Sequence, residues 1–88
     1  MNLFDAILPP AADEQITPLV ATPNLRIERI VSHGHHSAPD FWYDQAEDEW
    51  VYLVQGEGTL LFADGREMKL KPGDHCFIPA HQRHRVTS

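Results

Sequence analysis

Three histidines lie within ten positions of one another in the segment PGDHCFIPAHQRHRV, which covers residues 72–86. They are His75, His81 and His84. An imidazole that faces the inside of a fold is a common metal ligand, whereas one on a turn is only a solvated side chain. The function of this sequence therefore depends on which of the three points inward.

The carboxylate of Glu49, at the start of the segment EWVYLVQ, is the second candidate for chemistry. On a strand it would share a face with Val51 and Leu53, and an inward carboxylate there needs a cation, a hydrogen bond or a proton to compensate its burial. The alternative is that Glu49 is the solvated end of the acidic run DQAEDE. His84 shares a strand face with Val86, and the same choice between inward ligand and surface residue applies to it.

The elements that must position these groups are strands. From Leu25 onward the chain contains short alternating or β-branched runs separated by turn residues, which predicts an all-β sandwich or barrel. The runs are LRIERIV, FWYDQ, EWVYLVQ, GTLLFA, REMKL, HCFIP and HRV. Both faces of EWVYLVQ are largely apolar, so we expect one face to meet the core and the other a second sheet or a subunit.

Two turns are predicted between the later strands. Asp64 and Gly65 form a pair that can supply the positive φ angles of a two-residue hairpin. Residues 71–74, Lys-Pro-Gly-Asp, place proline where a turn needs φ near −65° and glycine directly after it. Residues 1–24 hold four prolines and no sustained period, which predicts a short helical turn around Leu3–Leu8 and then an irregular arm.

Composition limits the classes of function. A chain of 88 residues forms one domain, here an arm over 1–24 and a β-barrel over 25–88. Thirteen acidic against seven basic side chains give a net charge of −6, and no basic cluster indicates nucleic-acid binding. The N-terminus resembles neither a signal peptide nor a membrane span. Cys76 is the single cysteine, so no disulfide forms within the chain, and we expect a cytoplasmic protein.

Two segments together resemble the cupin family. Glu49, six residues and Gly56 resemble the end of the first cupin motif. Gly73, five residues, Pro79, one residue, a turn position, two residues and His84 resemble the second. The resemblance covers about two thirds of the chain, from Leu25 onward, and it is closest to small single-domain bacterial cupins.

The resemblance implies a short jelly-roll barrel around a metal or a small molecule, and it implies roles for single residues. Glu49 takes the position of the motif's glutamate, and His84 takes that of the second motif's histidine. His75 is expected at the rim of the barrel. His81 stands where the family usually has glycine, so it is expected to be exposed or at the mouth of the ligand pocket. The expected cofactor is a divalent transition metal, Fe, Mn, Ni or Zn.

The chain departs from the family where two further histidine ligands should precede the glutamate. With three intervening residues these positions are Tyr43 and Gln45, and with four they are Trp42 and Asp44. We favour the first register, which gives a metal set of Gln45, Glu49 and His84 with Tyr43 in the ligand pocket. A single nitrogen donor makes this set weaker than three histidines and a glutamate, so catalysis stays open.

The loop His33-Gly34-His35-His36 is a second candidate for metal, although a solvated loop is the simpler interpretation. The remaining aromatic residues are expected in the core or at an intersubunit face. The resemblance also implies strands after His84. We therefore expect a barrel that is incomplete at this end, or closed by another subunit or the N-terminal arm. Because an open edge beside HRV would invite aggregation, the sequence predicts a homodimer.

Three functions are compatible with these features. The first is a metal-binding member of the family that acts on a small polar molecule. The second is a binder or sensor of a small molecule without metal or catalysis. The third is an interaction module in which the barrel is only a scaffold. No residue names a substrate, because the same fold carries many chemistries.

Overall fold

The strands are connected by hydrogen bonds into three antiparallel sheets in the computed structural model, which describes residues 2–9, 14–34, 37 and 40–87. No helix occurs in these ranges, so the predicted all-β class is confirmed. The chain divides into two compact units, residues 1–35 and residues 36–88.

The first unit is a β-hairpin preceded by a turn. Strands β1 (Gln15–Ala21) and β2 (Arg26–Val31) pair antiparallel, and the register shifts between Pro18 and Val20. The expected irregular arm is therefore wrong over residues 15–21, which form a strand. The expected helical turn around Leu3–Leu8 is a non-helical turn instead. Its carbonyl groups accept hydrogen bonds from the guanidinium of Arg29 on β2.

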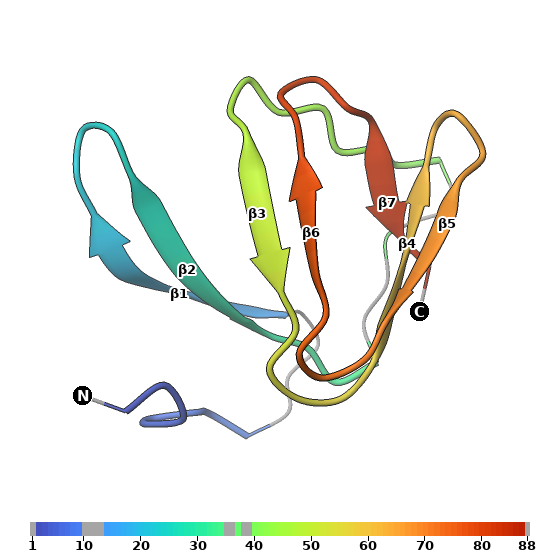
Figure 1. Ribbon diagram of the computed structural model, residues 1–88. Helices are drawn as coiled ribbons and strands as arrows, with labels where there is room; N and C mark the ends of the chain where they lie inside the picture. The colour runs from blue at the N-terminus through green and yellow to red at the C-terminus, as the bar shows by residue number, and fades with distance from the viewer. Residues whose placement is uncertain (1, 10–13, 35–36, 38–39, 88) are drawn as a thin grey trace. The chain divides into compact units, whose positions relative to one another are not determined.

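The second unit contains two sheets (Figure 1). One sheet pairs β3 (Glu49–Tyr52) with β6 (His75–Ile78). The other has the order β5–β4–β7, with β4 at Gly58–Phe62, β5 at Glu67–Leu70 and β7 at His84–Val86. Buried side chains from both sheets form a single cluster, Leu60, Phe62 and Leu70 from one and Cys76 and Ile78 from the other. Burial of these apolar groups holds the sheets together.

Both predicted turns of this unit form, each with a glycine at positive φ, but one of the two loops is longer than predicted. Gly73 has a φ of +91° and the Asp74 amide donates to the Lys71 carbonyl over 2.9 Å, as expected for the Lys-Pro-Gly-Asp turn. In the β4–β5 hairpin only Gly65 has a positive φ, +97°, and Phe62 pairs with Arg66 across three intervening residues. The expected two-residue turn is therefore wrong; the loop is one residue longer, with a single left-handed position.

Candidate functional site

His84 is the one buried polar side chain in the part of the chain that the structure describes, with 5% of its surface exposed. It opens β7, where it lies opposite Phe62 of β4. On its other side its backbone exchanges two hydrogen bonds with Tyr43, of 2.7 and 3.1 Å. Neighbours on both sides therefore fix the backbone from which this imidazole projects.

The protonation pattern of the His84 ring follows from one hydrogen bond. Nδ1 lies 2.8 Å from the carbonyl oxygen of Gln82. A carbonyl only accepts, so Nδ1 must carry the proton and donate it. In the neutral ring the lone pair is then on Nε2, the nitrogen that is available to a metal or a ligand. This arrangement resembles the outer-shell hydrogen bonds that orient metal-binding histidines.

Aromatic rings hold the imidazole in place. The ring of Tyr43 stacks on His84 with a centroid distance of 5.4 Å and an interplanar angle of 23°. The ring of Phe62 lies 6.2 Å away at 46°. The Tyr43 stacking and the hydrogen bond at Nδ1 together fix the direction in which the imidazole presents Nε2.

Glu49 is the group that faces this nitrogen. Its Oε1 lies 4.0 Å from Nε2 of His84, and its side chain is 37% exposed. It opens β3 opposite Ile78, one of the most deeply buried residues, so it is on the core face of the sheet. Both β3 and β7 begin at the upper end of the second unit in Figure 1. Each of the two sheets thus supplies one group to the same end of the unit.

The spacing of this pair fits an ion. A separation of 4.0 Å is too long for a direct hydrogen bond. Metal–nitrogen and metal–carboxylate bonds are each about 2.0–2.2 Å long, so an ion can reach both atoms at once. The donor types, one imidazole and one carboxylate, suit first-row transition metals. Within the described ranges, however, no group of three or more His, Cys, Asp or Glu side chains could hold a metal.

The other predicted site residues lie around this pair in different ways. Gln45 is half-buried, and its backbone carbonyl accepts a hydrogen bond of 2.7 Å from the backbone amide of His81. His81 has a φ of +64°, the left-handed conformation in which glycine is favoured, and its side chain is 69% exposed. Its Nδ1 lies 2.7 Å from Asp44 Oδ1. The structure therefore brings Tyr43, but not His81, against the buried imidazole.

Alternate residues of the FWYDQ segment lie in different surroundings. Tyr43 packs on His84, whereas Asp44 is exposed and paired with His81. Trp42 lies under the guanidinium groups of Arg83 and Arg85, which are 5.6 and 5.8 Å from its ring centroid. These contacts engage Trp42 and Asp44 away from the imidazole.

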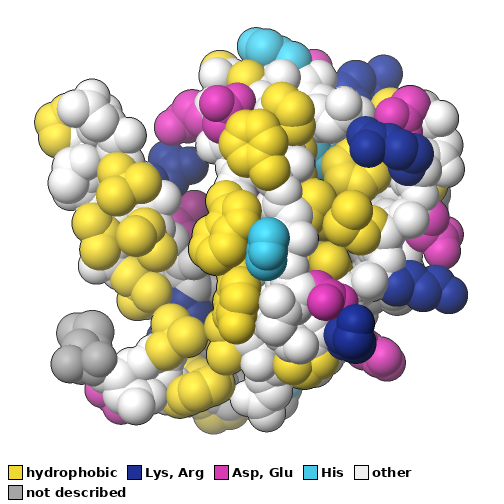
Figure 2. All heavy atoms as spheres, in the orientation of Figure 1, with side chains coloured by type: hydrophobic (Ala, Val, Ile, Leu, Met, Phe, Trp, Pro, Cys, Tyr) yellow, Lys and Arg dark blue, Asp and Glu magenta, His cyan; other side chains and the backbone are white. Residues whose placement is uncertain are grey.

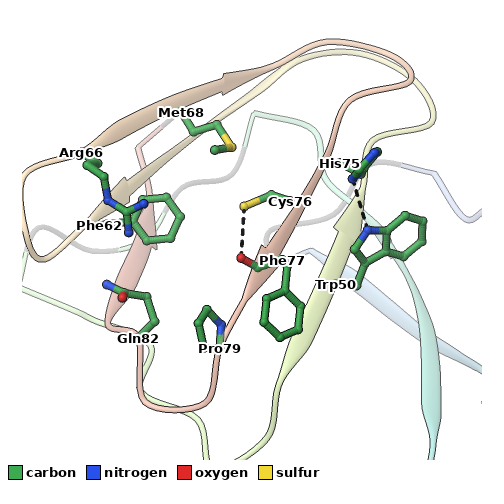
Figure 3. A pocket seen from close by; sticks show the side chains of 9 residues that line it. All are labelled: Trp50, Phe62, Arg66, Met68, His75, Cys76, Phe77, Pro79 and Gln82. Atoms are coloured by element: carbon green, nitrogen blue, oxygen red, sulfur yellow. Dashed lines mark hydrogen bonds between the residues drawn. The ribbon is translucent and has the colours of Figure 1, made fainter.

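His75 is distant from this chemistry. It lies on the outer face of β6, where its Nδ1 accepts a hydrogen bond of 3.3 Å from the indole of Trp50 (Figure 3). His75 and Trp50 also line an open hollow of about 540 Å³, together with apolar side chains of β4, β5 and β6 (Figure 3). Phe62 lines this hollow and also packs near His84, so the hollow lies next to the site without containing Glu49 or His84.

Cys76 lies in the wall of the same hollow and is buried. Desolvation raises the pKa of its thiol above the ordinary value of 9.0, with a further contribution from the charge of Glu49, while Arg66 acts in the opposite sense. The thiol therefore stays protonated at neutral pH. A protonated, buried thiol is a poor nucleophile.

Two contributors to the site were missed by sequence reasoning. Gln82 acts through its backbone carbonyl, and no side-chain type signals such a role. Phe62 belongs to a run that predicts a core strand, and nothing in that run distinguishes it from the other core residues, so the sequence does not predict its contact with His84. Of the histidine-rich loop, His33 is exposed, and His35 and His36 lie outside the described residues. No described segment forms a helix that is long and apolar enough to cross a membrane.

Comparisons with known proteins agree with this architecture. The family model for the cupin domain matches residues 28–88. A crystal structure from Ralstonia eutropha JMP134, described as a "putative mannose-6-phosphate isomerase", is 44% identical, with a TM-score of 0.91. The match covers 98% of this chain and 81% of that one. No curated protein sequence matched.

Proposed function

The chain belongs to the cupin family, and from that premise we propose that Glu49 and His84 bind a divalent transition metal together with a small polar molecule. The observation that carries the proposal is the 4.0 Å approach of a carboxylate to the free nitrogen of a buried imidazole. Gln45, a half-buried residue two positions after Tyr43, supplies its side-chain amide as the third ligand in this proposal.

Each side chain has a separate task in this proposal. His84 donates its Nε2 lone pair, and the Gln82 carbonyl keeps Nδ1 protonated so that this lone pair remains available. Glu49 supplies the negative charge, and its partial exposure lets a polar molecule reach it from solvent. Together Glu49 and His84 would hold a divalent ion, which would supply Lewis-acid polarisation of a carbonyl or hydroxyl oxygen of the bound molecule. Tyr43 covers the imidazole and excludes water from one side.

The substrate class to test first is a hydroxylated small molecule such as a sugar phosphate. The similar structure is described as a "putative mannose-6-phosphate isomerase", and its sequence identity of 44% makes mannose 6-phosphate a reasonable first probe. Interconversion of an aldose and a ketose moves a proton between neighbouring carbons, which requires a base near the sugar. In the absence of a metal on Glu49, its carboxylate would accept the proton from one carbon and return it to the neighbouring carbon.

A second candidate is a binder without metal. The absence of a cluster of three His, Cys, Asp or Glu ligands among the described residues favours it, because two strong donors retain a metal weakly. In that case the same Glu49 carboxylate and His84 Nε2 would hydrogen-bond the hydroxyl groups of the ligand directly.

The deciding experiment measures the metal content of tag-free protein by inductively coupled plasma mass spectrometry. The variants are Glu49→Gln and His84→Gln, and the matched control is His75→Gln, an exposed histidine on the outer face of β6. We expect near-stoichiometric metal in the wild type and the control, and at most about a tenth of that content in both site variants, because each variant removes one ligand.

The outcomes separate the two candidates. Metal that persists in both site variants would place the ion elsewhere, with the histidines of residues 33–36 as the next site to change. Metal-free protein that still binds mannose 6-phosphate in calorimetry, and loses this binding in His84→Gln, would support the second candidate. A wild type that binds neither metal nor sugar phosphates would refute the proposal.

A further inference from the structure

His81 occupies a backbone position that normally favours glycine. The backbone amide of Gln82 donates to the carbonyl of Pro79 over 3.1 Å, which closes a turn over residues 79–82 between β6 and β7. His81 is the third residue of this turn, and its φ of +64° is the left-handed value that glycine usually supplies there. A side chain that is kept at a strained backbone position points to a task for that side chain.

The turn is tied to the segment that precedes β3. Nδ1 of His81 donates to Oδ1 of Asp44 over 2.7 Å, because a carboxylate only accepts. The backbone amide of His81 donates to the carbonyl of Gln45 over 2.7 Å, and the amide of Ala80 donates to Asp48 Oδ1 over 2.8 Å. Figure 2 shows histidine and acidic side chains at the surface of this end of the second unit. Hydrogen bonds from His81 and Ala80 therefore anchor the turn to this segment.

The same turn ends in the carbonyl that orients the buried imidazole. Gln82 follows His81 directly, and its carbonyl accepts the hydrogen bond from Nδ1 of His84 over 2.8 Å. The direction of this carbonyl follows from the path of the turn, so it depends on where the turn is held. The segment to which His81 is bonded includes Gln45, and Tyr43 of that segment stacks on the imidazole. The contacts of His81 therefore join the two segments that contact this imidazole.

We propose that His81 is a positioning residue: through its bond to Asp44 it keeps the turn in the place where its last carbonyl holds Nδ1 of His84. The inference rests on the function proposed above, because a proton fixed on Nδ1 leaves the Nε2 lone pair available to a metal. When the bond to Asp44 is lost, the turn is held less firmly and its carbonyl no longer fixes the proton. His84 then also adopts the neutral form with the proton on Nε2, where it blocks a ligand.

Nitrogen NMR of the histidine rings in the metal-free protein tests this proposal. At a pH where His84 is neutral, the wild type should show one His84 tautomer, with the proton on Nδ1. His81→Gly suits the left-handed φ but removes the ring, whereas Asp44→Ala removes the acceptor and keeps the ring. Both variants should show a second His84 tautomer with the proton on Nε2. The matched control is Ala80→Gly, which loosens the same turn but keeps the pair, and its His84 signals should match the wild type.

A titration with Zn²⁺ measures the consequence for the proposed site. The affinity for Zn²⁺ should be about tenfold weaker in His81→Gly and in Asp44→Ala, the lower end of the loss that follows a change outside the ligands themselves. The double variant should lose no more than either single variant, because both changes remove the same contact. The melting temperature of His81→Gly should stay close to that of the wild type, since an exposed ion pair contributes little to stability and glycine fits this backbone.

The two measurements separate this inference from the function on which it rests. Identical His84 signals in the wild type, His81→Gly and Asp44→Ala would overturn the inference, whatever the protein binds. An equal disturbance of His84 in Ala80→Gly would also overturn it, because freedom of the turn alone would then be the cause. In a wild type that binds Zn²⁺, unchanged affinity in both variants would count against it in the same way. A wild type without affinity for Zn²⁺ would refute the proposed metal site, and the His84 tautomers would still decide the role of His81.

Discussion

At the scale of the residue, His84 combines a structural task with a chemical one. Its Nδ1 satisfies the Gln82 carbonyl inside the protein, while its Nε2 faces Glu49. His84→Ala should therefore lower the free energy of unfolding by about 1–3 kcal/mol, because it removes a buried ring and the part-buried hydrogen bond from that ring to the Gln82 carbonyl. Urea titration of wild type and variant measures this change.

The comparison variant for this prediction is His75→Ala. His75 is exposed, and water can replace it as the acceptor for the Trp50 indole, so we expect a change within about 0.5 kcal/mol. Equal losses in the two variants would mean that burial of His84 contributes nothing particular to stability.

The raised pKa of the Cys76 thiol predicts that the folded protein loses stability at alkaline pH. Its pKa is raised in the folded protein by burial, so the folded state holds the proton more tightly than the unfolded state. This contribution is complete below the ordinary pKa of 9.0 and is lost as pH rises through the higher folded value. Wild type should therefore lose stability between pH 9 and the raised pKa faster than Cys76→Ala does. Parallel melting curves over that pH range would contradict this prediction.

At the scale of the element, the Lys-Pro-Gly-Asp turn between β5 and β6 depends on one left-handed residue. Gly73 has a φ of +91°, which L side chains rarely adopt. Gly73→Ala should therefore cost about 1 kcal/mol, although the new methyl group would meet no other atom within 4 Å. Thermal melting measures the loss. Gly58→Ala in strand β4, where glycine has no such φ, should be neutral or stabilising.

The same turn makes a pH-dependent contribution. The backbone amide of Lys71 donates to Asp74 Oδ2 at 2.9 Å, and this bond, with the nearby Lys71 charge, lowers the pKa of Asp74 although desolvation opposes it. The stabilisation is present above the ordinary pKa of 3.8 and is lost as pH falls through the lowered value. Asp74→Asn should flatten the acid side of the stability curve, and an unchanged acid side would contradict this account.

The elements differ in how far the sequence predicted them. The alternation of EWVYLVQ and the two turn signals predicted β3 to β6 because each signal is local. Strand β1 was missed because Pro18 breaks the pattern, and the structure accommodates it at a shift of register, where a missing amide hydrogen does little harm. The stacking of Tyr43 on His84 joins residues far apart in sequence, so only the fold could show it.

At the scale of the whole molecule, stability is unevenly distributed between the two units. Every described residue of the buried apolar cluster belongs to residues 36–88, whereas no residue of β1 or β2 is fully buried. An isolated hairpin is marginally stable in water. Hydrogen exchange should therefore be faster in residues 15–31 than in β4 by on the order of tenfold or more. Equal protection in the two segments would mean that the β1–β2 hairpin resists local opening as strongly as the core does.

Glu49 belongs to the β3–β6 sheet and His84 to the β5–β4–β7 sheet. The distance between their side chains therefore depends on how closely the two sheets pack. A substitution deep in the core, such as Ile78→Val directly opposite Glu49, can retune affinity without touching a ligand atom. The relation also runs in reverse. A metal or small molecule that binds both the Glu49 carboxylate and the His84 imidazole links the two sheets. The melting temperature should therefore rise as the concentration of that ligand rises.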